Sequence, residues 1–151
     1  MLNETAPNFR LKDQNGNEFE LYNNLDQKVL LVFYPKDNSP VCTKQLNNYN
    51  QNMSEFNELC IRVVGVNVEN TKSHSTFCEN LELNFILLSD VDKVVSKLYN
   101  AVNLFGINKR KIVLINTDKK IMFEKTVLPF YYLNSDKIIQ EVKACKLDLL
   151  T

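Results

Sequence analysis

The chain has 151 residues, with 18 lysine or arginine residues against 18 aspartate or glutamate residues, so its formal net charge at pH 7 is zero. That length suits one compact domain, and the evenly spread charges argue against a nucleic-acid partner or an anionic membrane surface. The longest apolar run, residues 29–34, is too short to span a bilayer, and the polar start lacks a signal-peptide layout. We therefore expect a soluble, cytoplasmic protein in which residues 1–151 form a single domain.

The first part of the chain predicts a hairpin, a buried strand and a long helix. Residues 9–21 contain two short apolar segments around a polar, glycine-containing turn, which is typical of a β-hairpin. Residues 28–34 form a short, continuous run rich in β-branched and aromatic side chains, so they predict a strand buried on both faces. Pro40 suits the first turn of a helix because its missing N–H would be unpaired there. Apolar residues at three- and four-residue steps extend this helix to Leu59.

The rest of the chain continues to alternate strands with helices. We expect further strands at residues 61–66, 85–88, 111–116 and 121–125. We expect further helices at residues 71–82, 90–101 and 135–149. This alternation predicts an α/β fold in which helices flank a central mixed β-sheet.

Four cysteines without a secretory signal favour thiols, metal ligands or redox groups over a framework of structural disulfides. Cys42 would lie in the first turn of the helix that follows a buried strand. Unpaired backbone N–H groups and the positive end of the helix dipole favour a thiolate at such a position. Position alone leaves an inert thiol equally open, because buried cysteines commonly serve as small hydrophobic residues.

The residues around Cys42 carry a family resemblance. Pro35, Ser39 and Cys42 have the spacing Pro-x-x-x-Ser/Thr-x-x-Cys, and residues 33–43 resemble the active-site motif of the peroxiredoxins. The chain is most similar to the bacterioferritin-comigratory-protein branch, and matching residues recur within segments 6–13, 64–77 and 88–90. The resemblance implies a thioredoxin-like fold with an N-terminal β-hairpin and a thiol-dependent peroxidase activity.

The resemblance also implies roles for individual residues. The Cys42 thiolate would attack the peroxide, and Arg110, which matches an arginine at the head of a family strand, would stabilise the thiolate and donate to the peroxide. The Ser39 hydroxyl would orient the peroxide, and Pro35 would help to hold the loop. No metal or organic cofactor is required. A solvated surface charge is the alternative interpretation of Arg110, and Ile112 stands where the family strand usually has a hydroxyl residue.

The sulfenic acid formed on Cys42 must condense with a second thiol before further oxidation. Many members of this branch carry the resolving cysteine five residues after the nucleophile, where this chain has Asn47. Another subset carries it in a Ser-His-x-x-Phe-Cys segment, which matches residues 73–78. The resemblance therefore implies that Cys78 resolves Cys42 as an intramolecular disulfide, after a local opening that the polar segment 67–70 would permit. Thioredoxin or a similar dithiol would then reduce the disulfide.

The two remaining cysteines and the single histidine are interpreted as structural residues. We expect Cys60 and Cys145 to be packed thiols, and we expect His74 to cap or pack at the start of its helix. A zinc site at His74 and Cys78 is disfavoured because a four-coordinate site needs more ligands nearby. We expect a monomer rather than a dimer.

Three other functions remain open at this stage. A thioredoxin-like disulfide oxidoreductase would need Cys-x-x-Cys, which residues 42–45 lack. A redox sensor or chaperone would use the same thiol without rapid turnover. A single-cysteine peroxidase would dispense with Cys78, because an external thiol would reduce the sulfenic acid directly.

Overall fold

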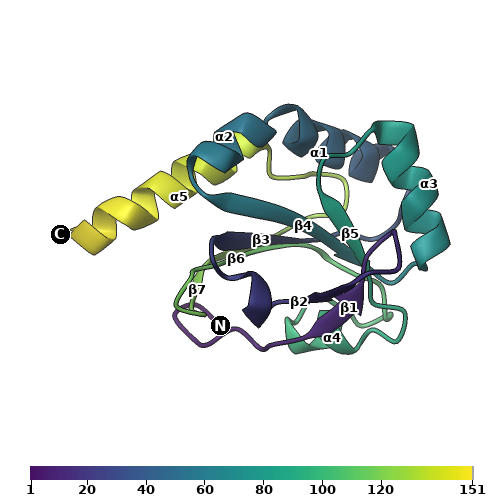
Figure 1. Ribbon diagram of the computed structural model, residues 1–151, viewed down its shortest axis with the longest axis horizontal. Helices are drawn as coiled ribbons and strands as arrows, with labels where there is room; N and C mark the ends of the chain where they lie inside the picture. The colour runs from purple at the N-terminus through teal and green to yellow at the C-terminus, as the bar shows by residue number, and fades with distance from the viewer. Residues whose placement is uncertain (151) are drawn as a thin grey trace.

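The computed structural model describes the backbone of residues 1–150 and the side chains as far as residue 145. Seven strands form one sheet in the order β2-β1-β5-β4-β3-β6-β7 (Figure 1). The strands are β1 (Arg10–Lys12), β2 (Glu18–Glu20), β3 (Lys28–Phe33), β4 (Ile61–Asn67), β5 (Ile86–Ser89), β6 (Arg110–Ile115) and β7 (Ile121–Val127). The helices are the 3-10 turn η1 (Tyr22–Asn24), α1 (Pro40–Gln51), α2 (Met53–Glu58), α3 (Thr71–Leu81), α4 (Val94–Leu98) and α5 (Ser135–Leu150).

The sheet is mixed, as the sequence predicts. Strand β3 lies between a parallel neighbour, β4, and an antiparallel neighbour, β6. Strand β5 continues the parallel side, while β1 and β7 pair antiparallel with β5 and β6. The predicted N-terminal hairpin is the antiparallel pair β1 and β2. Helices α1, α2, α3 and α5 cover one face of the sheet, and α4 lies on the other (Figure 1).

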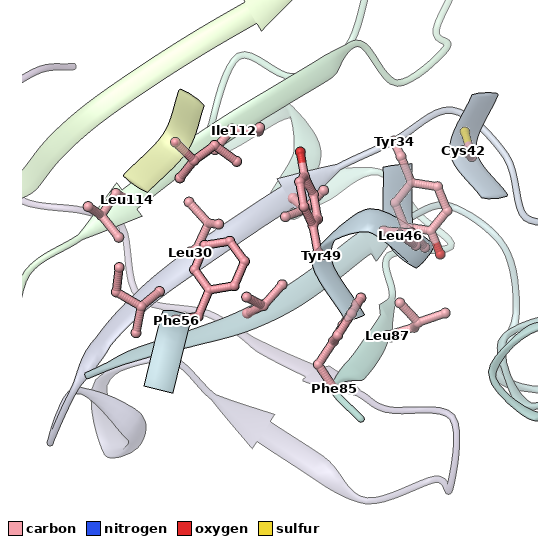
Figure 2. Packing of buried hydrophobic residues seen from close by; sticks show 14 of the residues in the cluster. Leu30, Tyr34, Cys42, Leu46, Tyr49, Phe56, Phe85, Leu87, Ile112 and Leu114 are labelled. Carbon is pink, nitrogen blue, oxygen red and sulfur yellow. The ribbon is translucent and has the colours of Figure 1, made fainter. Parts of the chain in front are cut away.

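Side chains of β3 alternate between two buried clusters, because successive residues of a strand point to opposite faces. Leu30 and Val32, with Tyr34 directly after the strand, join the cluster beneath α1, α2, α3 and α5, which we call the upper core. Val29, Leu31 and Phe33 join the cluster on the α4 side. In Figure 2, Leu30 of the upper core lies near Tyr49 and Phe56, and Cys42 lies beyond Tyr34 at one end of this core.

The prediction of one long helix from Pro40 to Leu59 is wrong in one respect, because the structure divides this helix at Asn52. The Asn52 backbone has φ −112° and ψ 22°, and it separates α1 from α2. The side-chain amide of Asn52 donates to the carbonyl oxygen of Asn48 at 2.7 Å, while its backbone N–H donates to Tyr49 instead. A side chain that binds the carbonyl four residues back competes with the regular helical hydrogen bond.

The helix predicted over residues 90–101 is also shorter than expected and covers only α4. The carboxylate of Asp90 accepts hydrogen bonds from the backbone N–H groups of Val95 and Ser96, at 3.2 and 2.6 Å. These N–H groups would bind carbonyls of residues 91 and 92 in a helix that began at Asp90. Lys93 has φ 65°, so the helix begins only at Val94. None of the helices among residues 1–150 combines the length and apolarity needed to cross a membrane.

Candidate active site

Cys42 lies in the first turn of α1, directly after the loop that leaves the carboxyl end of β3 (Figure 2). Pro40 opens the helix, as predicted from its missing N–H. The backbone N–H of Cys42 donates to the hydroxyl oxygen of Ser39 at 3.4 Å, and this hydroxyl donates to the carbonyl oxygen of Lys36 at 3.3 Å. Ser39 is therefore the N-cap of α1 in this structure. Its role toward a peroxide remains a prediction, as does the loop-holding role of Pro35.

Arg110 begins β6, beside the carboxyl end of β3, and its side chain reaches Cys42. One terminal nitrogen, Nη1, donates to Cys42 Sγ at 3.2 Å and to the side-chain oxygen of Gln45 at 2.9 Å. The Nε and Nη2 groups donate to the carbonyl oxygen of Pro129 at 3.2 and 3.0 Å. Arg110 is only 4% exposed, and Cys42 is fully buried. The interpretation of Arg110 as a solvated surface charge is therefore wrong.

Gln45 is a member of the site that the sequence analysis missed. It is fully buried, and its amide nitrogen donates to the Tyr49 hydroxyl at 3.0 Å. Burial raises the pKa of Tyr49, so its hydroxyl keeps its proton and donates to the carbonyl oxygen of Leu133 at 2.5 Å. A signal was present in the sequence, because Gln45 lies three residues after Cys42 and therefore shares its helix face.

Cys78 lies on α3 and belongs to the same upper core as Cys42. Both thiols are free. Burial, together with the negative charges of Asp37, Asp13 and Glu79, raises the pKa of Cys78 to about 12. Because the thiolate is the nucleophile in disulfide formation, Cys78 is poorly reactive while α3 stays packed in this position.

The remaining cysteines differ from the sequence prediction. Cys60 is exposed rather than packed, because it occupies the turn between α2 and β4 with φ 56°. Cys145 is partly exposed, and its thiol lies 3.7 Å from the carbonyl oxygen of Met122. Among the described residues, no group of three or more histidine, cysteine, aspartate or glutamate side chains is arranged to hold a metal ion.

His74 packs near the start of α3, as expected, but it does not cap the helix. The cap is Asn70, whose side-chain oxygen accepts from the backbone N–H of Ser73 at 2.9 Å. His74 is fully buried and contacts Asp37 of the loop before Cys42. The polar segment 67–70, expected to permit opening, is tied down in this structure, since Asn67 is buried and also donates to Asp37.

Arg62, a second arginine in the middle of the chain, lies far from this site along the sheet. It is opposite Val29 at the beginning of β3 and β4, whereas Cys42 follows the carboxyl end of β3. Its Nη1 donates to the side-chain oxygen of Asn24 at 2.6 Å. The structure thus brings together Cys42, Arg110 and Gln45, and it leaves Arg62 outside.

Known proteins resemble this chain in sequence and in fold. The sequence pattern of the AhpC/TSA family matches residues 2–124. A bcp peroxiredoxin of Helicobacter pylori is 45% identical over 100 residues, which are 66% of this chain and 66% of that protein, just under two thirds of its length. A bcp peroxiredoxin of Buchnera aphidicola is 35% identical over 89% of this chain and 94% of its own length. The crystal structure of peroxidoxin BcpB from Mycobacterium tuberculosis superposes with a TM-score of 0.85 at 27% identity, covering 95% of this chain and 96% of that one. The chain has the thioredoxin-like peroxiredoxin fold, and it belongs to the AhpC/TSA family as a peroxiredoxin of the Bcp type.

Proposed function

We propose that this protein is a thiol peroxidase that reduces hydrogen peroxide and organic hydroperoxides with Cys42 as the nucleophile. The observation that carries the proposal is the 3.2 Å contact between Arg110 Nη1 and Cys42 Sγ in a buried site. A guanidinium at this distance favours the thiolate over the thiol and keeps a cation where negative charge develops during the reaction.

The first step is attack of the Cys42 thiolate on one peroxide oxygen. A sulfur–oxygen bond forms as the O–O bond breaks, so Cys42 becomes a sulfenic acid and the second peroxide oxygen leaves as an alkoxide or hydroxide, which takes up a proton. Arg110 stabilises the charge on the leaving oxygen, and the Ser39 hydroxyl assists if it turns away from Lys36. Since Cys42 is fully buried, side chains around it must move before a peroxide can reach the sulfur.

In the second step Cys78 attacks the Cys42 sulfur, releasing the sulfenic oxygen as water and leaving a disulfide. The burial of Cys78 requires α3 or the first turn of α1 to open for this step. A cytoplasmic dithiol protein such as thioredoxin then reduces the disulfide through a mixed disulfide, returning both residues to thiols.

Peptide mapping by mass spectrometry tests the assignment of the two cysteines. The reduced protein receives one equivalent of hydrogen peroxide, and the remaining thiols are alkylated before digestion. We expect a disulfide that joins the Cys42 and Cys78 peptides, with Cys60 and Cys145 alkylated. Oxidised Cys42 with a free Cys78 would keep the peroxidase but remove the resolver, and an unreacted Cys42 would remove the proposed function.

The variant Cys78→Ser separates the two-cysteine route from a single-cysteine route. Serine cannot close the disulfide, so we expect Cys42 to stop at the sulfenic acid or become overoxidised, and turnover with thioredoxin to be lost. Turnover at the rate of the unmodified protein would show that an external thiol reduces Cys42 directly.

We expect Gln45 to act as a positioning residue for Arg110. Gln45→Leu removes the acceptor that holds Nη1 beside the sulfur, so we expect kcat/KM for peroxide to fall about tenfold to a hundredfold. The matched control is Gln51→Leu, which makes the same change at an exposed position of α1. Equal activity of the two variants would mean that Pro129 and Cys42 suffice to hold Arg110.

A further inference from the structure

A buried contact joins the loop before Cys42 to the helix that carries Cys78. Asp37 on the loop is 2% exposed, and His74 on α3 is fully buried. His74 Nδ1 lies 2.7 Å from a carboxylate oxygen of Asp37, and Nε2 lies 3.0 Å from the carbonyl oxygen of Leu88 on β5. One imidazole thus links the active-site loop, α3 and the sheet.

The hydrogen-bond partners of Asp37 and His74 indicate how many protons this pair carries. Burial acts to raise the pKa of Asp37, but the hydrogen bond and charge of His74, together with hydrogen bonds from Tyr34 and Ser73, outweigh burial and lower it. Asp37 is therefore a carboxylate. Because both imidazole nitrogens then face oxygen acceptors, both must carry hydrogen, and His74 is an imidazolium in the closed structure. Loss of one proton leaves either Asp37 or the Leu88 carbonyl without its donor.

The titratable groups that contact this pair or act on its neighbours Tyr34 and Cys78 carry negative charge or none, and the lysines nearest to it in the chain, Lys36 and Lys72, are exposed. Asp13 lies in the turn after β1, and Tyr34 directly follows β3. Cys42 lies on α1, Glu69 precedes α3, and Cys78 and Glu79 lie on α3. Burial keeps Tyr34 and Cys78 protonated, since it raises the pKa of each group. If the pair lost a proton, the positive charge of His74 would disappear, and none of these groups would replace it.

Repulsion then favours separation of the loop and α3. The hydroxyl of Ser73 bridges the carboxylates of Asp37 and Glu69, and the backbone N–H of Asp37 donates to Glu69 at 3.2 Å. The single hydrogen of this hydroxyl can serve one carboxylate at a time. With His74 neutral, the buried carboxylate of Asp37 would lie beside the half-buried carboxylate of Glu69 without the charge of the imidazolium, a costly arrangement that α3 relieves by moving away.

We propose that the Asp37–His74 pair is a proton-dependent latch that positions α3 against the active-site loop and controls the opening needed for Cys78 to reach Cys42. The latch rests on the proposed function, because its opening matters for turnover only if Cys78 is the resolving cysteine. While the pair holds its proton, the sulfenic acid on Cys42 has a longer lifetime before Cys78 attacks it, so it reacts more often with further peroxide. When the pair loses its proton as the pH rises, α3 opens more often and the disulfide forms sooner.

Opening can be measured without any peroxide chemistry. In reduced Cys42→Ser protein, N-ethylmaleimide alkylates Cys78 only when α3 opens, whereas exposed Cys60 reports the intrinsic reactivity of a thiol at each pH. We expect the ratio of the Cys78 rate to the Cys60 rate to rise at least about tenfold from about pH 6 to about pH 8.5, the change that loss of one charged hydrogen bond produces. A ratio independent of pH would overturn the latch.

Two variants separate charge from packing. Asp37→Asn can donate an amide hydrogen to Nδ1 while Nε2 keeps its hydrogen for Leu88, so the contact survives without a proton to lose. We expect its ratio to stay low and flat across the pH range. His74→Gln can serve only one of the two acceptors and carries no charge, so we expect a high and flat ratio. A pH slope in either variant equal to that of the parent would also overturn the latch.

The protonation state itself is accessible because His74 is the only histidine in the chain. Nitrogen-15 NMR of the reduced protein should show both ring nitrogens protonated at about pH 6, and a coincident loss of one proton where the Cys78 ratio rises. A neutral ring throughout would contradict the latch. Failure of the parent chain to form the Cys42–Cys78 disulfide would instead remove Cys78 as the resolving cysteine, and with it the effect of the latch on turnover, while leaving these two measurements unchanged.

Discussion

Replacing Cys42 by serine is expected to reduce peroxide consumption to the uncatalysed background, a loss of at least about a thousandfold in kcat/KM. Serine matches cysteine in size and can occupy the same helix turn. Its hydroxyl stays protonated near neutral pH, however, and oxygen is a far weaker nucleophile toward peroxide than a thiolate. The measurement is peroxide consumption coupled to thioredoxin and its reductase at low enzyme concentration.

The control for this variant is Cys60→Ser, which makes the same substitution at an exposed thiol outside the upper core. We expect its rate to equal that of the unmodified protein. Rapid turnover in Cys42→Ser would mean that another cysteine attacks the peroxide. A single oxidation of the unmodified protein without continued turnover would instead favour the redox sensor.

Replacing Arg110 by methionine is expected to lower kcat/KM by about a hundredfold to a thousandfold. Methionine preserves much of the buried apolar stem but removes the donors that reach Cys42, Gln45 and Pro129. The thiolate then loses its cation, and the leaving oxygen loses a donor in a site where water is scarce. We expect Arg110→Lys to be nearly as damaging, because an ammonium cannot copy the planar set of donors.

The matched control is Arg62→Met, at an arginine whose contact is with Asn24 near the opposite end of β3. Its kcat/KM should remain within a few-fold of the unmodified protein. Thermal unfolding of both variants separates a catalytic loss from a folding defect, and the rate of Cys42 alkylation reports the thiolate directly. An Arg110→Met protein that is folded and fully active would remove Arg110 from the mechanism.

The two chemical steps place opposite demands on the same part of the fold. In the proposed mechanism, the attack on peroxide would need an intact first turn of α1, because Ser39 and Arg110 contact Cys42 only in that geometry. Resolution needs that geometry to break locally, so that Cys78 leaves the upper core. The latch at Asp37 and His74 would set the balance between these demands, since it connects both segments.

Local sequence patterns predicted most of the architecture because they report burial. The apolar run at residues 29–34 forms most of β3, the central strand, and the alternation of strands and helices identified the mixed sheet. The division of the long helix at Asn52 and the short α4 were missed, because each depends on one side chain that takes a backbone group away from the helix.

The sequence by itself also identified Cys42, Ser39, Arg110 and Cys78 as candidate residues, through the spacing of the motif and the family it resembles. Only the tertiary structure decided which other side chains and backbone groups form hydrogen bonds with these residues. Gln45 and Arg110 are 65 residues apart in the chain, and Asp37 and His74 are 37 apart. Periodicity reports which side of an element is buried, but the partners of a buried polar group depend on which elements meet there, and that is a property of the folded chain.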